Sequence, residues 1–179
     1  MTGFRTPILP ACIVAALAAA PIEPAAAGEQ ATVEAFAAWS GEGRAVQTGP
    51  KEATFVGTIS GTVYVLTEKG PIEGGQMICP AIVRVNMDDG SQNGSGRCSF
   101  TAKDGAQIFA ELTCTGIHLI GCDGDFTLTG GSGRFGGIGG GGRVTLRSDF
   151  RQLVGVSGGA VVESVSGIMF WPSLSYQIP

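Results

Sequence analysis

The sequence has a single histidine, His118, and no cluster of lysine and arginine residues. Its 179 residues include 11 Lys and Arg against 15 Asp and Glu, which gives a formal net charge of −4. Proteins that bind nucleic acids or anionic membrane surfaces concentrate positive charge, because they must neutralise phosphate groups. The scarcity of basic residues therefore argues against both kinds of partner.

Long hydrophobic runs are also missing. The longest, residues 8–20, holds about 13 residues, fewer than the roughly 20 that a membrane-spanning helix needs. It follows Arg5 and precedes a small-residue stretch that ends at Ala27, which is typical of a secretory signal. We therefore expect residues 1–27 to be a signal peptide cleaved after Ala27, the mature chain to have no membrane span, and the protein to be secreted or periplasmic.

Helical periodicity is almost absent. A short apolar period at Val33, Phe36 and Ala37 is equally consistent with extended chain, so residues 28–50 are expected to form a lead-in segment and residues 51–179 the barrel domain. From Glu52 onward apolar and polar residues alternate between Gly-, Asp- and Asn-containing turns, which predicts seven or eight antiparallel strands. Such runs of strands make sandwiches or barrels. The expected strands cover residues 53–66, 81–87, 97–102, 107–114, 125–129, 143–147, 160–165 and 168–178.

Proline and glycine are expected to interrupt this pattern at two places. Residues 69–75 contain Pro71 and several glycines and are predicted to form a loop. Pro172 cannot donate a ladder hydrogen bond, so it marks a bulge or an edge position within residues 168–178.

The register of one hairpin depends on its turn at Asp104-Gly105. A two-residue turn would place Phe100 opposite Phe109, whereas a three-residue loop at residues 103–105 places Phe100 opposite Ile108. The second register is favoured because it buries the apolar side chains together and leaves Glu111 facing water. If the cavity lay on the other side, Glu111 would be a buried acid and a candidate catalytic base.

Four cysteines follow residue 27, and an even number in an exported chain suggests disulfides. Their spacing contains no CxxC or CxxH motif, so a zinc site is not expected. Alternation places all four on the inward face. Pairing of neighbouring strands suggests Cys79–Cys98 and Cys114–Cys122, one of three possible connectivities.

The most distinctive stretch is GGSGRFGGIGGGGR, residues 130–143, between two alternating segments. It matches the spacing GxGxxG, which binds a nucleotide only where a helix opens at its end. Here five more glycines follow, and such a run does not nucleate a helix. We therefore expect the glycines to allow positive φ angles and close backbone approach at a barrel corner, and we expect no cofactor.

Residues 129–142 resemble the GGTGxFxxAxG signature of allene oxide cyclase and dirigent proteins. The chain is also similar to small exported bacterial proteins of that barrel type, which have no assigned activity: in them an element like Gly96-Arg97-Cys98 precedes an Asp-Gly turn, a Phe-x-Glu strand and a cysteine. This resemblance implies an all-β, eight-stranded antiparallel barrel with a central cavity. Plant members cyclise an oxidised fatty acid or guide the coupling of phenolic radicals. No residue outside the glycine motif matches their pockets, so these activities do not carry over.

Residues with possible chemistry are few and scattered. His118 has no assignable carboxylate or nucleophile partner and is expected in a loop or hairpin. Asp123 and Asp125 lack calcium-loop spacing and are expected in a turn. Asn93-Gly94-Ser95 fits the N-glycosylation pattern, which matters only in a eukaryotic secretory route. No catalytic, metal or cofactor-binding residue is assigned. Trp39, Tyr64, Trp171 and Tyr176 are expected in the core or at the barrel rim.

The favoured hypothesis for function is a non-catalytic binder of a small apolar ligand, because the fold implies a cavity and no catalytic constellation is present. One alternative is a cofactor-free isomerase or cyclase, which needs a polar group with a shifted pKa inside the cavity. Another is a structural or interaction protein of the cell envelope, which needs an exposed apolar patch. The sequence leaves the oligomeric state and the ligand open.

Overall fold

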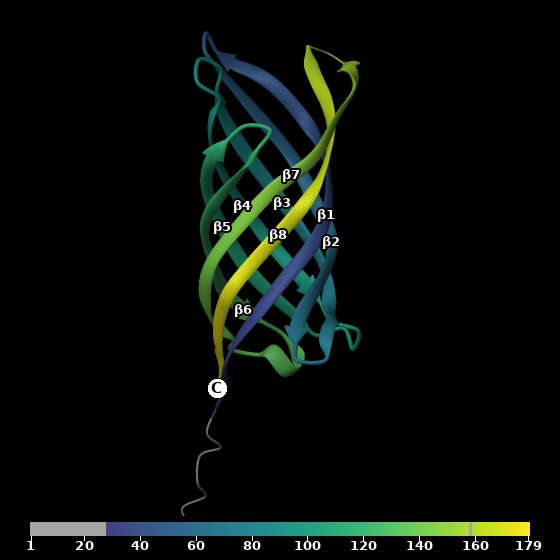
Figure 1. Ribbon diagram of the computed structural model, residues 1–179, viewed down its shortest axis with the longest axis vertical. Coiled ribbons are helices and arrows are strands. Elements are labelled where there is room, and N and C mark those ends of the chain that lie inside the picture. The colour runs from purple at the N-terminus through teal and green to yellow at the C-terminus, as the bar shows by residue number, and fades with distance from the viewer. Residues whose placement is uncertain (1–27, 158) are drawn as a thin grey trace, which may run out of the picture.

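The computed structural model describes residues 28–157 and 159–179, and the side chains of these residues other than 150–157. The expected signal peptide, residues 1–27, lies outside the described residues. Eight antiparallel strands pair in chain order and β8 closes on β1, so the chain forms a closed barrel (Figure 1). The predicted all-β antiparallel barrel is confirmed. The strands are β1 (Glu29–Gly49), β2 (Glu52–Thr67), β3 (Gly70–Asn86), β4 (Ser91–Thr101), β5 (Gln107–Ile117), β6 (Gly121–Gly131), β7 (Gly139–Ser157) and β8 (Ala160–Ile178).

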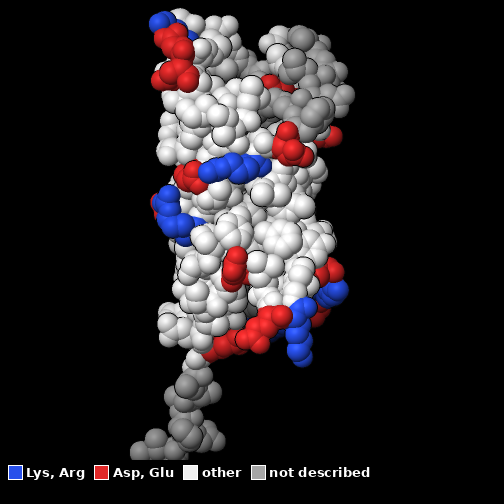
Figure 2. All heavy atoms as spheres, viewed as in Figure 1, with Lys and Arg blue, Asp and Glu red and all other residues white. Residues whose placement is uncertain are grey.

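The two ends of the barrel are called the lower and the upper end, as they lie in Figure 1. The lower end holds both termini of the described chain and the β2–β3, β4–β5 and β6–β7 connections, and the upper end holds the other four turns. Much of the visible wall between the ends is formed by uncharged side chains, with charged residues in separate groups (Figure 2).

The first strand corrects the expectation of a lead-in segment over residues 28–50. Strand β1 is a full member of the barrel, paired with β2 on one side and β8 on the other. Its inward residues Ala35, Ala37 and Trp39 are buried. Alanine and glycine at most inward positions give little hydrophobic contrast, so alternation alone did not reveal this strand.

Bulges in β3 and β8 decide two of the predictions. The loop expected at residues 69–75 is wrong, because β3 already begins at Gly70; the register instead shifts beside Gly74, where Val63 pairs with Gly75 and Tyr64 with Glu73. The bulge predicted at Pro172 is confirmed, since Ala35 pairs with Trp171 while Val33 pairs with Leu174. A bulge keeps a strand in the ladder while adding one unpaired residue. The strands expected at residues 160–165 and 168–178 form the single strand β8, because Ser166 and Gly167 between them also pair with β1.

The β4–β5 hairpin has the favoured register. Phe100 lies opposite Ile108. The turn holds residues 103–105, and Gly105 adopts a φ of 83°, the left-handed conformation that this loop type requires.

The glycine tract connects β6 to β7 at the lower end. It contains one turn of 3-10 helix, Gly133–Phe135, which was not expected, but the glycines that follow enter strand β7 rather than a helix. Close backbone approach explains part of the composition: a Cβ at Gly140 would lie 2.8 Å from the Cα of Tyr176 on β8. A phosphate-binding helix start is therefore absent from this part of the chain.

The lower half of the interior is filled by aromatic side chains. Phe126 and Trp171 meet edge to face with ring centroids 5.2 Å apart, and Phe100 contacts both rings. Met77 and Met169 are fully buried beside them. Protein interiors pack about as densely as organic crystals, so these side chains fill the space around them.

Two buried disulfides join neighbouring strands, with the connectivity that strand adjacency suggested. Cys79–Cys98 links β3 to β4, and Cys114–Cys122 links β5 to β6. The second bond runs diagonally, because Cys114 lies opposite Gly124 and Cys122 lies opposite Gly116. A Cβ at Gly124 would overlap the Thr113 carbonyl and lie 2.6 Å from the Cα of Cys114. The diagonal link therefore requires glycine at this corner.

We expect Gly124→Ala to destabilise the fold by roughly 1–3 kcal/mol, the usual cost of overpacking, and to lower the melting temperature by roughly 3–10 °C. Gly139→Ala is the matched control, because nothing lies within 4 Å of a Cβ there. Thermal melts of both variants with intact disulfides measure the difference. Equal melting temperatures for the two variants would contradict the packing argument.

Candidate functional site

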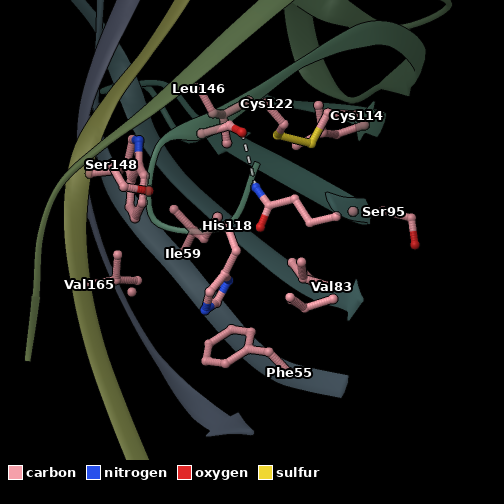
Figure 3. Close-up of a pocket in the computed structure, with 18 of the residues that line it drawn as sticks. Phe55, Ile59, Val83, Ser95, Cys114, His118, Cys122, Leu146, Ser148 and Val165 are labelled. Carbon is pink, nitrogen blue, oxygen red and sulfur yellow. Dashed lines mark hydrogen bonds between the residues drawn. A yellow bond between two sulfur atoms is a disulfide. The ribbon is translucent and has the colours of Figure 1, made fainter. Parts of the chain in front are cut away.

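A cavity of about 90 Å³ lies in the upper half of the barrel (Figure 3). Its walls are mainly apolar: Phe55, Ile59, Val83, Leu112, Leu146 and Val165 face it, and the Cys114–Cys122 disulfide forms part of the wall.

The cavity exists because several inward positions here carry small side chains. Gly41, Ala81 and Gly94 line it on three different strands. A Cβ at Gly41 would lie 3.5 Å from side-chain carbons of both Ile59 and Val165. Like the aromatic residues in the lower half, these three residues point into the barrel. They have a methyl group or no side chain, so the space between them is not filled.

Gln92 supplies a fixed polar group at the mouth. Its Nε2 donates a hydrogen bond of 3.1 Å to the carbonyl oxygen of Gly121. Gly116 lies on β5, the strand between those of Gln92 and Gly121, and it has no side chain that would block this hydrogen bond. The bond sets the orientation of the amide, so the Oε1 atom of Gln92 is left as an acceptor for other groups.

His118 also lines the cavity and lies in the β5–β6 turn, as expected for a loop or hairpin residue. Its imidazole points toward the ring of Phe55 (Figure 3). Its backbone N–H donates to the Gly90 carbonyl at 2.8 Å. Ser148, half-buried on β7, lines the same cavity, and its backbone N–H donates to the Ile120 carbonyl at 3.1 Å. Sequence reasoning missed Gln92 and Ser148, because isolated polar residues near strand ends carry no recognisable spacing.

The other residues considered from the sequence lie on the outer wall. Glu111 faces outward and pairs with Arg97 at 2.8 Å, so it is a surface charge and not a buried acid. Asp123 and Asp125 are not in a turn; both are exposed on β6 and pair with arginines of β7. Asn93 is exposed on β4.

The aromatic residues divide between core and wall. Trp39 and Trp171 are buried, as expected. Tyr64 is half-buried and stacks on Phe36 with ring centroids 5.3 Å apart. Tyr176 donates a hydrogen bond of 3.0 Å to Glu29. Burial raises the pKa of Tyr176, and this hydrogen bond raises it further.

Asp89, Asp123 and Tyr176 have shifted pKa values, and none of these three residues lines the cavity. Within the described part of the chain, no group of three or more His, Cys, Asp or Glu residues is placed to hold a metal ion. No helix in that part is long and apolar enough to cross a membrane. The cavity is thus a mainly apolar pocket. Its lining includes the polar residues Thr58, Gln92, Ser95, His118 and Ser148, and the last of these, with Gln92 and His118, lies near its mouth.

Comparison with known proteins adds little to this picture. Neither a protein-family model nor a curated protein matches the chain. Among solved structures, it is similar to a pterocarpan synthase dirigent protein, with 10% sequence identity and a TM-score of 0.31. That similarity covers 84% of this chain and 96% of the other. The class defined by the strand pairing is an eight-stranded antiparallel barrel with a cavity at one end.

The charge network on the outer wall leads to a pH prediction. The pKa of Asp123 is lowered by a hydrogen bond from the Thr145 hydroxyl and by a second from Arg147. A carboxyl with a lowered pKa in the folded state stabilises the fold above its unfolded pKa of about 3.9, and this stabilisation is lost as the pH falls through the folded value.

We therefore expect Asp123→Asn to lower the melting temperature by roughly 1–3 °C near neutral pH, the scale of an exposed ion pair. The effect shrinks as the pH falls from about 3.9 through the lower folded value, because the wild-type carboxyl then becomes protonated. Paired melts of wild type and variant near neutral pH and at the lowest pH at which both are folded measure it. The same difference at both values would show that the carboxylate charge plays no part.

Proposed function

We propose that this barrel binds a small, mainly apolar molecule in its upper cavity without transforming it, as a secreted or periplasmic protein. The observation that supports this is the uneven filling of the interior: aromatic packing fills one half, and apolar walls surround empty space in the other. An empty cavity costs stability, because its walls lose contacts that a filled core would make. A ligand of matching size restores those contacts.

The volume limits the size of that ligand. Pockets for drug-sized molecules enclose about 300–1,000 Å³, several times the cavity seen here. An engineered apolar cavity of roughly 150 Å³ in another protein stays dry and binds benzene. The occupant is accordingly a molecule of about that size or smaller.

The polar groups favour a ligand with one hydroxyl group. With its amide nitrogen bound to Gly121, Gln92 presents an acceptor oxygen, and the Ser148 hydroxyl lies in the same lining. A ligand hydroxyl that donates to Gln92 gains a net hydrogen bond of roughly 0.5–1.5 kcal/mol.

Binding is favoured over isomerase activity by the lining itself. Most of the side chains that face the cavity are apolar, and both lining cysteines are joined in a disulfide. The isomerase alternative requires a cavity-lining group with a shifted pKa, and Asp89, Asp123 and Tyr176, whose pKa values are shifted, all lie outside the cavity.

The first test fills the cavity. Cyclopentanol and methylcyclopentane serve as probes, and chemical-shift changes of backbone amides report binding. We expect Val165→Phe to abolish binding of both probes, because the larger ring occupies the space that they need. Val56→Phe is the matched control, since Val56 faces outward and is 55% exposed. Gly41→Ala is a milder filling variant: its added methyl contacts Ile59 and Val165 at 3.5 Å, although the Thr58 carbonyl oxygen, 3.2 Å away, must give slightly. Absence of binding to the wild type would refute the proposed function.

The second test concerns the polar anchor. We expect the wild type to bind cyclopentanol roughly 2–10-fold more tightly than methylcyclopentane, the equivalent of one net hydrogen bond. Gln92→Leu should remove this preference while methylcyclopentane still binds. If the preference survives in Gln92→Leu, Gln92 is not the anchor, although the cavity still binds ligands.

A further inference from the structure

Three large apolar side chains are exposed together at the upper end, in the β5–β6 hairpin. Ile117, Leu119 and Ile120 are 45%, 58% and 61% exposed. Two of them, Leu119 and Ile120, lie in the turn itself, where a hairpin usually carries polar or glycine residues.

The turn holds these side chains outward in a fixed conformation. The Ile120 N–H donates to the Ile117 carbonyl at 3.1 Å, and the Ile120 carbonyl accepts from Ser148 of β7. Leu119 adopts a φ of 70°, the left-handed region; it is the one non-glycine with positive φ in residues 28–157 and 159–179. A leucine rarely adopts this conformation, because its Cβ crowds the backbone. Both exposure and strain are unfavourable in the isolated protein.

Charge distinguishes this hairpin from its neighbour. Residues 115–122 contain no Asp, Glu, Lys or Arg. The adjacent β3–β4 turn, joined to the hairpin by the bond from His118 to Gly90, carries Asp88 and Asp89. Lys51 pairs with Asp88 at 2.5 Å, whereas Asp89 accepts a hydrogen bond from the backbone N–H of Ser91.

We propose that this hairpin docks the barrel on a lipid surface of zero net charge, with Leu119 and Ile120 inserted among the lipids. A protein partner would need a hollow shaped to this convex turn, whereas a bilayer interface accepts it without a preformed site. Insertion buries no charged side chain of the hairpin, so it avoids the cost of desolvating an ion. The neighbouring acidic turn repels anionic headgroups, so a neutral surface is the matching partner.

The position of the hairpin links the surface to the cavity. His118 belongs to the same turn and lines the cavity mouth. Docking through Leu119 and Ile120 therefore brings the cavity mouth to the lipid surface. The proposal rests on the hairpin alone and stands whether or not the cavity binds the probes described above.

The test is flotation with lipid vesicles. Wild type and variants are mixed with vesicles of phosphatidylcholine, or of phosphatidylcholine with roughly a third phosphatidylglycerol. The double variant Leu119→Ser with Ile120→Ser removes the apolar turn. The matched control, Ile78→Ser with Ile82→Ser, removes two apolar side chains from the barrel wall that are 51% and 44% exposed.

We expect the wild type and the wall variant to float with phosphatidylcholine, and the turn variant to lose at least about tenfold in vesicle affinity. Binding of the wild type should weaken with phosphatidylglycerol at low salt and recover as salt screens the repulsion. No flotation of the wild type, equal loss in both variants, or tighter binding to the anionic vesicles would each overturn the proposal. Melting curves of both variants verify that they are folded.

Discussion

The structure depends on one constraint: in a closed, hydrogen-bonded barrel every second residue must point inward. Closure removes all free strand edges, and the pairing register fixes the direction of each side chain. The size of the inward residues then decides whether the interior is filled or hollow. In the lower half they are Trp171, Phe126 and Phe100, which fill it. In the upper half Gly41 and Gly94 stand at equivalent inward positions and leave a cavity.

The glycines have several distinct roles within this constraint. Gly140 lets β8 approach β7 closely, and Gly124 makes room for a disulfide that crosses β5 and β6 diagonally. Gly116 clears the path by which Gln92 reaches the Gly121 carbonyl. Gly94 leaves room for the same disulfide, because a Cβ there would lie 3.2 Å from the Sγ of Cys114. High glycine content is therefore a property of the whole barrel wall and does not mark a single binding loop.

The sequence allowed the face of each residue to be predicted wherever large apolar and polar residues alternate. The β4–β5 register, the outward direction of Glu111 and the common inward face of the cysteines followed from this contrast. The prediction was wrong for β1, where alanine and glycine weaken the contrast, and for residues 69–75, where a bulge imitates a loop.

The position of the cavity was beyond sequence reasoning, because it depends on the summed volumes of residues from most of the strands. The polar mouth was hidden for a related reason. Gln92, His118 and Ser148 come from β4, the β5–β6 turn and β7, and they come together only once the barrel closes. The resemblance in the glycine tract implied a barrel with a cavity, which the strand pairing and the pocket now show directly. It implied nothing about which end is hollow.

The hollow upper half beneath the exposed β5–β6 turn is the central claim, because both binding and access depend on it. The most direct measurement is X-ray diffraction from crystals of the protein under xenon pressure, since xenon enters apolar cavities that water leaves empty. The account predicts xenon density between Phe55, Ile59 and Val165. A barrel without xenon at that position, its side chains closed over the space, would contradict it.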